Sequence, residues 1–86
     1  MKFALNKAWG GFSLSKEFCS LYPEFRTYSF IERNDPRLIK FLEDHDGKMG
    51  TVVLVTLEGT PTDYVLNDYD GKESIIYVVD GKLHFA

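Results

Sequence analysis

The 86-residue sequence has little cysteine and histidine, no long apolar run and no basic cluster, and each scarcity excludes a class of protein. The single cysteine, Cys19, cannot form an intramolecular disulfide, which excludes a disulfide-stapled secreted scaffold. No CxxC or HxxxH spacing occurs, so we expect no metal site. No segment approaches the length of a membrane span, and no apolar signal-peptide core follows the first three residues. We therefore expect a cytosolic protein with no membrane partner.

Positive charge is sparse in the second half of the chain. Ten Lys and Arg stand against 13 Asp and Glu, and the net charge is −3. Residues 48–86 hold three of these cations and six of the acids. Duplex binding requires a basic face that releases counterions from the phosphates. We therefore expect no duplex nucleic-acid partner, although the scattered cations of the first half still allow a small anionic ligand.

Catalytic residues are equally hard to assign. A nucleophilic mechanism would require Cys19 or a serine beside His45 or His84, and the sequence gives no sign of such a pair. Residues 68–73 (DYDGKE) fail the EF-hand pattern, because apolar or aromatic residues stand at the first and twelfth ligand positions. We expect no enzymatic activity and no cofactor, and a small hydrolase is the third alternative for function.

Apolar residues are abundant at 44%, with seven Phe, five Tyr and one Trp, so the chain can form a real core. The length suits one domain covering residues 1–86. A domain of this size buries only about 60–65% of its unfolded surface. A large internal ligand cavity is therefore disfavoured, and we expect function on a surface groove, a loop or an interface.

The order of apolar patterns and turn residues predicts an α+β fold, a mainly antiparallel sheet with two short helices in the order β-α-β-α-β-β-β-β. Two Asp-Gly pairs, at 70–71 and 80–81, favour hairpin turns and make the last strands a meander. The segment 52–57 is almost entirely apolar, which predicts a central strand covered on both faces. The predicted strands cover residues 2–9, 25–31, 52–57, 63–69, 74–79 and 82–85.

The two helices are predicted from their boundary residues. The first begins at Ser13 or Ser15 and ends before Pro23, because the residue before a proline avoids helical geometry. The second begins with Asp35 as its cap and a proline in the first helical position, and it ends at Gly47. Leu38, Ile39 and Leu42 are expected to form its buried face, with Phe41 and His45 beside it.

Gly10 and Gly11 stand between the first strand and the first helix, where a phosphate-binding loop is one interpretation. The loop lacks the Lys-Ser/Thr of a P-loop and the third glycine of a dinucleotide fingerprint. Two interpretations therefore stay open. The first is a tight turn capped by Ser13 or Ser15, with Trp9 and Phe12 in the core. The second is an anion site at the start of the helix, with Lys7 or Arg33 supplying charge.

Three stretches, NKAWGGFSLS, RNDPRLIKFLE and YDGKESI, resemble a group of small proteins of tailed phages and prophages. Those proteins share the pattern INKxxGGFxLS, then RxDPxL, then ExYDGxE. The sequence departs from the pattern at Leu5, at Asn67-Asp68 and in its apolar tail after Ser74. The resemblance implies a phage-encoded protein that works in the host cytoplasm. The matching positions are Asn6, Lys7, Gly10, Gly11, Phe12, Ser13, Leu14, Ser15, Arg33, Asp35, Pro36, Tyr69, Asp70, Gly71 and Glu73.

These observations predict a phage-encoded, non-enzymatic binding protein that inhibits or sequesters a host component. One version is an anti-defence protein that binds a small nucleotide immune signal. Its expected ligand-binding residues are Asn6, Lys7, Trp9, Gly10, Gly11, Phe12, Ser13, Ser15, Arg33, Asp35 and Tyr69. If the three stretches meet in space, this loop is a site, and if they lie apart, it is a turn.

The alternative version is a protein–protein inhibitor of a host enzyme that acts through its acidic C-terminal meander. Its expected partner-binding residues are Asp68, Asp70 and Glu73. A homodimer or higher oligomer is also expected, because small sheets with exposed edges tend to pair. The strand at 82–85 is one such edge.

Overall fold

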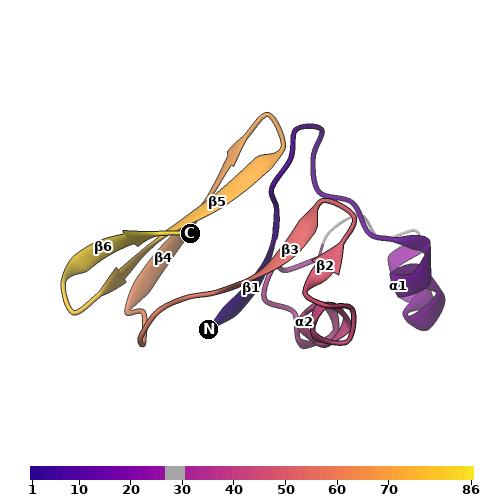
Figure 1. The fold of residues 1–86 in the computed structure, drawn as a ribbon, viewed down its shortest axis with the longest axis horizontal. Coiled ribbons are helices and arrows are strands. Elements are labelled where there is room, and N and C mark those ends of the chain that lie inside the picture. The colour runs from indigo at the N-terminus through magenta and orange to yellow at the C-terminus, as the bar shows by residue number, and fades with distance from the viewer. Residues whose placement is uncertain (27–30) are drawn as a thin grey trace.

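The computed structural model describes residues 1–26 and 31–86, and it confirms the α+β class and the C-terminal meander (Figure 1). The helical elements are α1 (Lys16–Leu21), the 3₁₀ helix η1 (Pro23–Arg26) and α2 (Pro36–Glu43). The strands are β1 (Lys2–Asn6), β2 (Lys48–Met49), β3 (Val52–Thr56), β4 (Asp63–Tyr69), β5 (Lys72–Val79) and β6 (Lys82–Phe85).

The strands form two three-stranded antiparallel sheets. Sheet A has the order β1-β3-β2, and sheet B has the order β4-β5-β6. Sheet A lies between the helices on one side and sheet B on the other, so the molecule has three layers (Figure 1). β3 is the central strand of sheet A, as its apolar sequence predicts.

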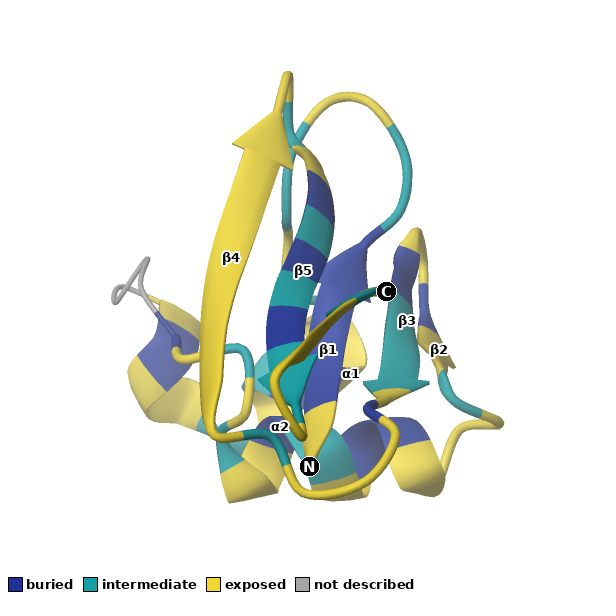
Figure 2. Cartoon of the chain, turned by 90° about the vertical axis from the view of Figure 1, so that its left-hand side faces the viewer, coloured by how far each residue is buried: buried dark blue, intermediate teal, exposed yellow. Residues whose placement is uncertain are grey.

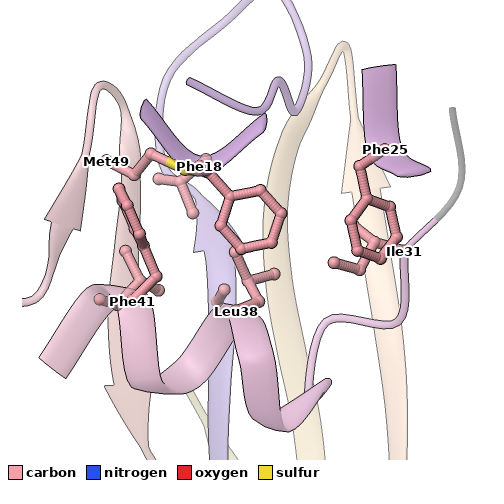
Figure 3. Packing of buried hydrophobic residues seen from close by; sticks show 9 residues of the cluster. Phe18, Phe25, Ile31, Leu38, Phe41 and Met49 are labelled. Atoms are coloured by element: carbon pink, nitrogen blue, oxygen red, sulfur yellow. The ribbon is translucent and has the colours of Figure 1, made fainter. Parts of the chain in front are cut away.

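Sheet A has a hydrophobic cluster on each face because its strands alternate. Ala4 belongs to the cluster under the helices, whereas Phe3 and Leu5 belong to the cluster shared with sheet B. Figure 3 shows the helical cluster, in which Phe18 and Leu38 lie close together above α2. Burying both faces of one small sheet lets an 86-residue chain build two cores on a common middle layer.

The starts of both α-helices follow the predicted capping residues. Ser15 caps α1, and its hydroxyl accepts the Phe18 backbone N–H at 3.1 Å. Asp35 caps α2, and its carboxylate accepts the Arg37 backbone N–H at 2.9 Å. α2 itself ends at Glu43, earlier than the predicted Gly47. Asp46 and Gly47 then both have positive φ values, +57° and +73°, and the Gly47 N–H bonds the Leu42 carbonyl.

The buried face of α2 differs from the prediction in one respect. Leu38 and Leu42 are buried as expected, but the third buried residue is Phe41, and Ile39 is only partly buried. Phe41 packs edge-to-face on Phe18, with ring centroids 5.4 Å apart. The aromatic contact with α1 therefore sets the rotation of α2.

Two predictions in the first third of the chain are wrong in the described residues. Phe25 and Arg26 lie in η1 rather than in a strand, and the rest of that predicted strand falls on Ile31 and on residues 27–30, which lie outside the described part. Phe25 is 7% exposed and packs on Phe18, so tertiary packing overrides the local β preference. β1 ends at Asn6, and Trp9 is 62% exposed instead of packing in the core.

The meander is built as its Asp-Gly pairs predict. Asp70 and Gly71 have φ values of +51° and +86°, and Asp80 and Gly81 have +51° and +75°. Two-residue turns with both φ values positive match the twist of the flanking strands. All seven residues of β4 are exposed, which Figure 2 shows as a continuous band along the strand.

Candidate functional site

The three stretches that the sequence singles out meet in space, around the carboxylate of Glu73 at the start of β5. Its two oxygens accept hydrogen bonds from the Arg33 guanidinium at 2.7–3.1 Å, and Oε1 also accepts the Asn6 backbone N–H at 2.9 Å. Arg33 Nη1 donates to the Ile31 carbonyl, and its guanidinium lies 3.7 Å from the ring centroid of Phe12. Glu73 is only 5% exposed and the Arg33 side chain 20%, so this ion pair is largely buried.

The side chain of Asn6 extends this cluster into the neighbouring loops. It is fully buried, and its amide donates to the carbonyls of Ala8, at 2.8 Å, and Gly71, at 2.5 Å. Its own carbonyl accepts the Thr51 hydroxyl. Asn6 therefore joins β1, the loop that carries Gly10 and Gly11 (the glycine loop) and the β4–β5 turn through bonds that satisfy the whole amide group.

Lys7 is also bonded within the cluster. Its ammonium donates to the Glu73 backbone carbonyl at 3.0 Å. Partial burial lowers the pKa of Lys7, the nearby Lys72 lowers it further, and the Glu73 carboxylate acts in the opposite direction. The Lys7 side chain therefore points toward the region where sheets A and B contact each other.

The glycine loop and the β4–β5 turn are in backbone contact, and this contact explains the glycine at position 71. The Gly10 N–H donates to the Asp70 carbonyl at 3.3 Å, and the two loops lie side by side (Figure 1). A Cβ at Gly71 would lie 2.1 Å from the backbone nitrogen of Gly11. Gly10 and Gly11 themselves have φ values of +105° and +100°, which favour glycine.

The remaining predicted ligand residues have structural contacts or lie apart from one another. Ser15 caps a helix of six residues, and Ser13 is an exposed loop residue. Asp35 bonds Arg37, whose side-chain hydrogen bond is the main reason why the pKa of Asp35 is lowered. The structure thus brings Asn6, Lys7 and Arg33 together, but it bonds each of them to other parts of the chain.

A different surface carries exposed apolar groups. On the side of sheet B away from sheet A, Val65 and Phe85 flank Ile76 across the three strands. In the next row Leu83 lies opposite Val78. We call this surface the outer face, and it consists of Val65, Tyr69, Lys72, Ile76, Val78, Leu83 and Phe85, with Trp9 beside Tyr69.

Five large side chains of the outer face and its margin are strongly exposed. They are Trp9 at 62%, Val65 at 63%, Leu83 at 64%, Tyr69 at 70% and Phe85 at 73%. The Trp9 and Tyr69 rings make an edge contact with centroids 5.7 Å apart, and the Lys72 ammonium lies 5.5 Å from the Trp9 ring. Large apolar side chains that are exposed side by side are typical of interaction surfaces.

Acidic residues surround the outer face, but not all of those that the sequence suggests. Asp63, Asp70 and Asp80 are exposed along its edges and turns. Asp68 is also exposed, and its carboxylate accepts the Gly71 N–H at 2.8 Å. Glu73, the third predicted partner-binding acid, is inside the molecule and bonded to Arg33.

Sequence reasoning did not single out Val65, Leu83 and Phe85. The available signal is in β4, which carries apolar or aromatic residues in both phases of the strand alternation, although a strand with one solvated face needs only one apolar phase. The apolar residues of β6, Leu83 and Phe85, share a single phase. When an edge strand carries apolar residues on both faces, one face packs on the core and the other is left as an exposed apolar surface that a partner can cover.

Other features of the described residues give no catalytic arrangement. A pocket of about 400 Å³ lies beside α1, and its lining includes Cys19, Lys16 and Arg26 but no histidine. No group of three His, Cys, Asp or Glu side chains in the described ranges is placed to hold a metal ion. No helix of residues 1–26 and 31–86 is long and apolar enough to cross a membrane.

Comparison with known proteins adds no family: no family model, no curated protein and no solved structure matches the chain.

Proposed function

We propose that the protein is a non-enzymatic protein-binding module whose recognition surface is the outer face of sheet B with Trp9 at its margin. One observation supports this most strongly: Trp9, Val65, Tyr69, Leu83 and Phe85 are 62–73% exposed on one side of a small domain. Leaving this much apolar surface in water is unfavourable, and covering it with a partner provides the driving force for binding. Aromatic residues at the margin supply rigid contact area.

The chemistry of the surface specifies the partner. Its centre is apolar, and Asp63, Asp70 and Asp80 stand around it without a cation partner among the described residues. Charge complementarity then favours a protein with an apolar patch and a rim of Lys or Arg. This is the protein–protein version of the function that the sequence predicts, with apolar residues rather than Glu73 as the main contacts. The phage origin and the host target stay predictions.

The nucleotide version keeps one supporting observation, at Trp9 and Tyr69 of its expected ligand-binding residues rather than at the start of α1. Trp9 and Tyr69 present exposed rings, and Lys72 lies beside them as a cation for a phosphate. Base stacking with a neighbouring cation is the usual chemistry of such ligands. Titration of the protein with a panel of cyclic dinucleotides and ADP-ribose derivatives tests this version. A nucleotide that stacks on Trp9 should bind the wild type and not Trp9→Ala.

The protein–protein version is tested with substitutions of similarly exposed residues on and off the outer face. Leu83→Lys and Phe85→Lys place a cation on this face, whereas Leu21→Lys changes a residue of α1 that is 63% exposed. Proteins that bind the immobilised wild-type chain are identified and purified, and their affinities for the three variants are measured directly. Partners that bind Leu83→Lys and Phe85→Lys as tightly as the wild type would overturn the proposal.

Trp9 supplies an independent signal because it is the only tryptophan. A partner that covers the outer face moves an exposed indole into an apolar environment, so its emission shifts to shorter wavelength on binding. A partner that binds without changing Trp9 emission, and whose affinity is unaffected by Phe85→Lys, binds elsewhere.

A further inference from the structure

One of the two edges of sheet B is the strand β4, and it has few of the features that normally prevent strands from pairing. Sheet B has the order β4-β5-β6, and no strand in the described residues pairs with the other side of β4. The strand is seven residues long, all of them exposed, and it contains no Lys, Arg or Pro. Natural edge strands are commonly short, covered, or protected by lysine or proline.

The backbone groups at this edge can be assigned from the hairpin. Tyr69 and Lys72 flank a two-residue turn, which makes them a hydrogen-bonded pair. Bonds in an antiparallel ladder alternate between the two sides of a strand, so Tyr64, Leu66 and Asp68 direct their N–H and C=O groups away from β5. In agreement, the Tyr64 N–H donates to the Asp63 side chain rather than to β5.

We propose that this edge pairs with β4 of a second copy, antiparallel and with Leu66 opposite Leu66 of that copy. This register pairs all seven residues of the strand and uses the outward-directed groups on both chains. Leu66 bonds its counterpart, and Tyr64 bonds the residue equivalent to Asp68, which gives six hydrogen bonds between the copies. The Tyr64 N–H exchanges the Asp63 carboxylate for a backbone carbonyl.

The side chains fit the same register. Each β4 carries two carboxylates and no cation, so a pairing that brought carboxylates together would be unfavourable. With Leu66 at the centre, Asp63 lies opposite Tyr69 of the second copy, and Asp68 lies opposite Tyr64. Leu66, which is 41% exposed in the single chain, packs on its counterpart. A parallel in-register pairing would instead place every Asp beside another Asp.

The result is a six-stranded sheet, β6-β5-β4-β4-β5-β6, around a two-fold axis normal to the sheet. Both outer faces then lie on the same side of that sheet. This dimer does not depend on the proposed partner binding, because it uses the strand edge and leaves Leu83 and Phe85 exposed. The edge strand β6 is a weaker candidate, since it has four residues and begins with Lys82.

Oligomeric state tests the proposal with a pair of matched variants. Leu66→Pro removes an N–H that points away from β5, which an edge strand tolerates, so the single chain still folds. Leu83→Pro does the same at the free edge of β6, because Val79 and Lys82 form the hydrogen-bonded pair of that hairpin. Light scattering after size exclusion at about 100 μM should give twice the 9.9 kDa chain mass for the wild type and Leu83→Pro.

Leu66→Pro should give the mass of one chain, with circular dichroism that matches the wild type. Amide hydrogen exchange adds a residue-level result: the Leu66 N–H should be protected at high protein concentration and lose that protection on dilution. A wild-type chain that is monomeric under these conditions overturns the proposal. So does a dimer that survives Leu66→Pro and dissociates with Leu83→Pro.

Discussion

At the scale of single residues, Glu73 holds the two sheets together. Its carboxylate bonds Arg33 and the Asn6 N–H, and its carbonyl accepts Lys7. Glu73→Gln removes the charge and leaves the Arg33 guanidinium, 20% exposed, without a carboxylate. We expect the free energy of unfolding to fall by about 3 kcal/mol, because breaking one side of a buried pair leaves the other charge uncompensated.

Urea denaturation measures this loss, and the exposed pair between Lys2 and Glu43 provides the control. Both side chains of that pair are more than 40% exposed, so Glu43→Gln should change the free energy by about 0.5 kcal/mol or less. Equal effects of the two substitutions would show that the Glu73 cluster does not join the sheets.

Asp35 provides a pH-dependent test at the same scale. The Arg37 side chain is the main cause of the lowered pKa of Asp35, and the folded value lies below the ordinary 3.8. A group with a depressed folded pKa stabilises the fold above its unfolded pKa, and this contribution is lost as pH falls through the folded pKa. Asp35→Ala should therefore cost about 1 kcal/mol at pH 7.

The cost of Asp35→Ala should decrease below pH 4, because the Asp35 carboxyl of the unfolded chain takes up a proton at a higher pH than that of the folded chain. Thermal unfolding of wild type and variant between pH 7 and pH 3 measures this change. Asp35→Asn keeps a capping oxygen and should show a smaller loss at pH 7. If Asp35→Ala lowered the stability by the same amount at every pH in this range, the charge of Asp35 would not stabilise the fold.

At the scale of elements, the two Asp-Gly turns look equivalent in the sequence but differ in their surroundings. Gly71 lies against the backbone of Gly11, whereas a Cβ at Gly81 would meet nothing within 4 Å. Both have positive φ, so alanine at either position costs about 1 kcal/mol in backbone strain. Gly71→Ala should cost about 2 kcal/mol more, because two backbone segments must move apart.

Comparing the two alanine variants by urea denaturation separates this close contact from the strain of the turn. Similar stabilities for Gly71→Ala and Gly81→Ala would show that the glycine loop does not depend on packing against the β4–β5 turn.

The elements that the sequence predicts well are those with local signals. The cap at Asp35, the positive φ at Gly47 and the hairpin turns each depend on a few neighbouring residues, and all are confirmed. The strand predicted at 25–31 is wrong in its described part because Phe25 packs on Phe18, a contact that alternation does not encode. The division into two sheets also depends on packing between distant segments.

At the scale of the whole molecule, the three stretches meet. Their polar side chains bond one another where sheet A contacts sheet B, and they do not point toward an open binding site. The sequence singles out residues that lie together, since Asn6 and Arg33 both bond the Glu73 carboxylate. The sequence does not reveal that these charges pair with each other. Arg, Lys and Glu occur both in ligand-binding sites and in internal ion pairs, so the residue types do not distinguish the two. Exposure of Trp9 is likewise a property of the assembled fold.

The central claim is that recognition takes place on the outer face of sheet B, with Trp9 at its margin, and not at an anion site formed by Gly10, Gly11 and the start of α1. The most direct measurement is the affinity of a purified partner for wild type, Phe85→Lys and Leu21→Lys, with Trp9 emission recorded in each titration. We predict that Phe85→Lys weakens binding on the order of tenfold or more, whereas Leu21→Lys stays within about twofold of the wild type. Unchanged affinity of Phe85→Lys, with no shift in Trp9 emission, would contradict the claim.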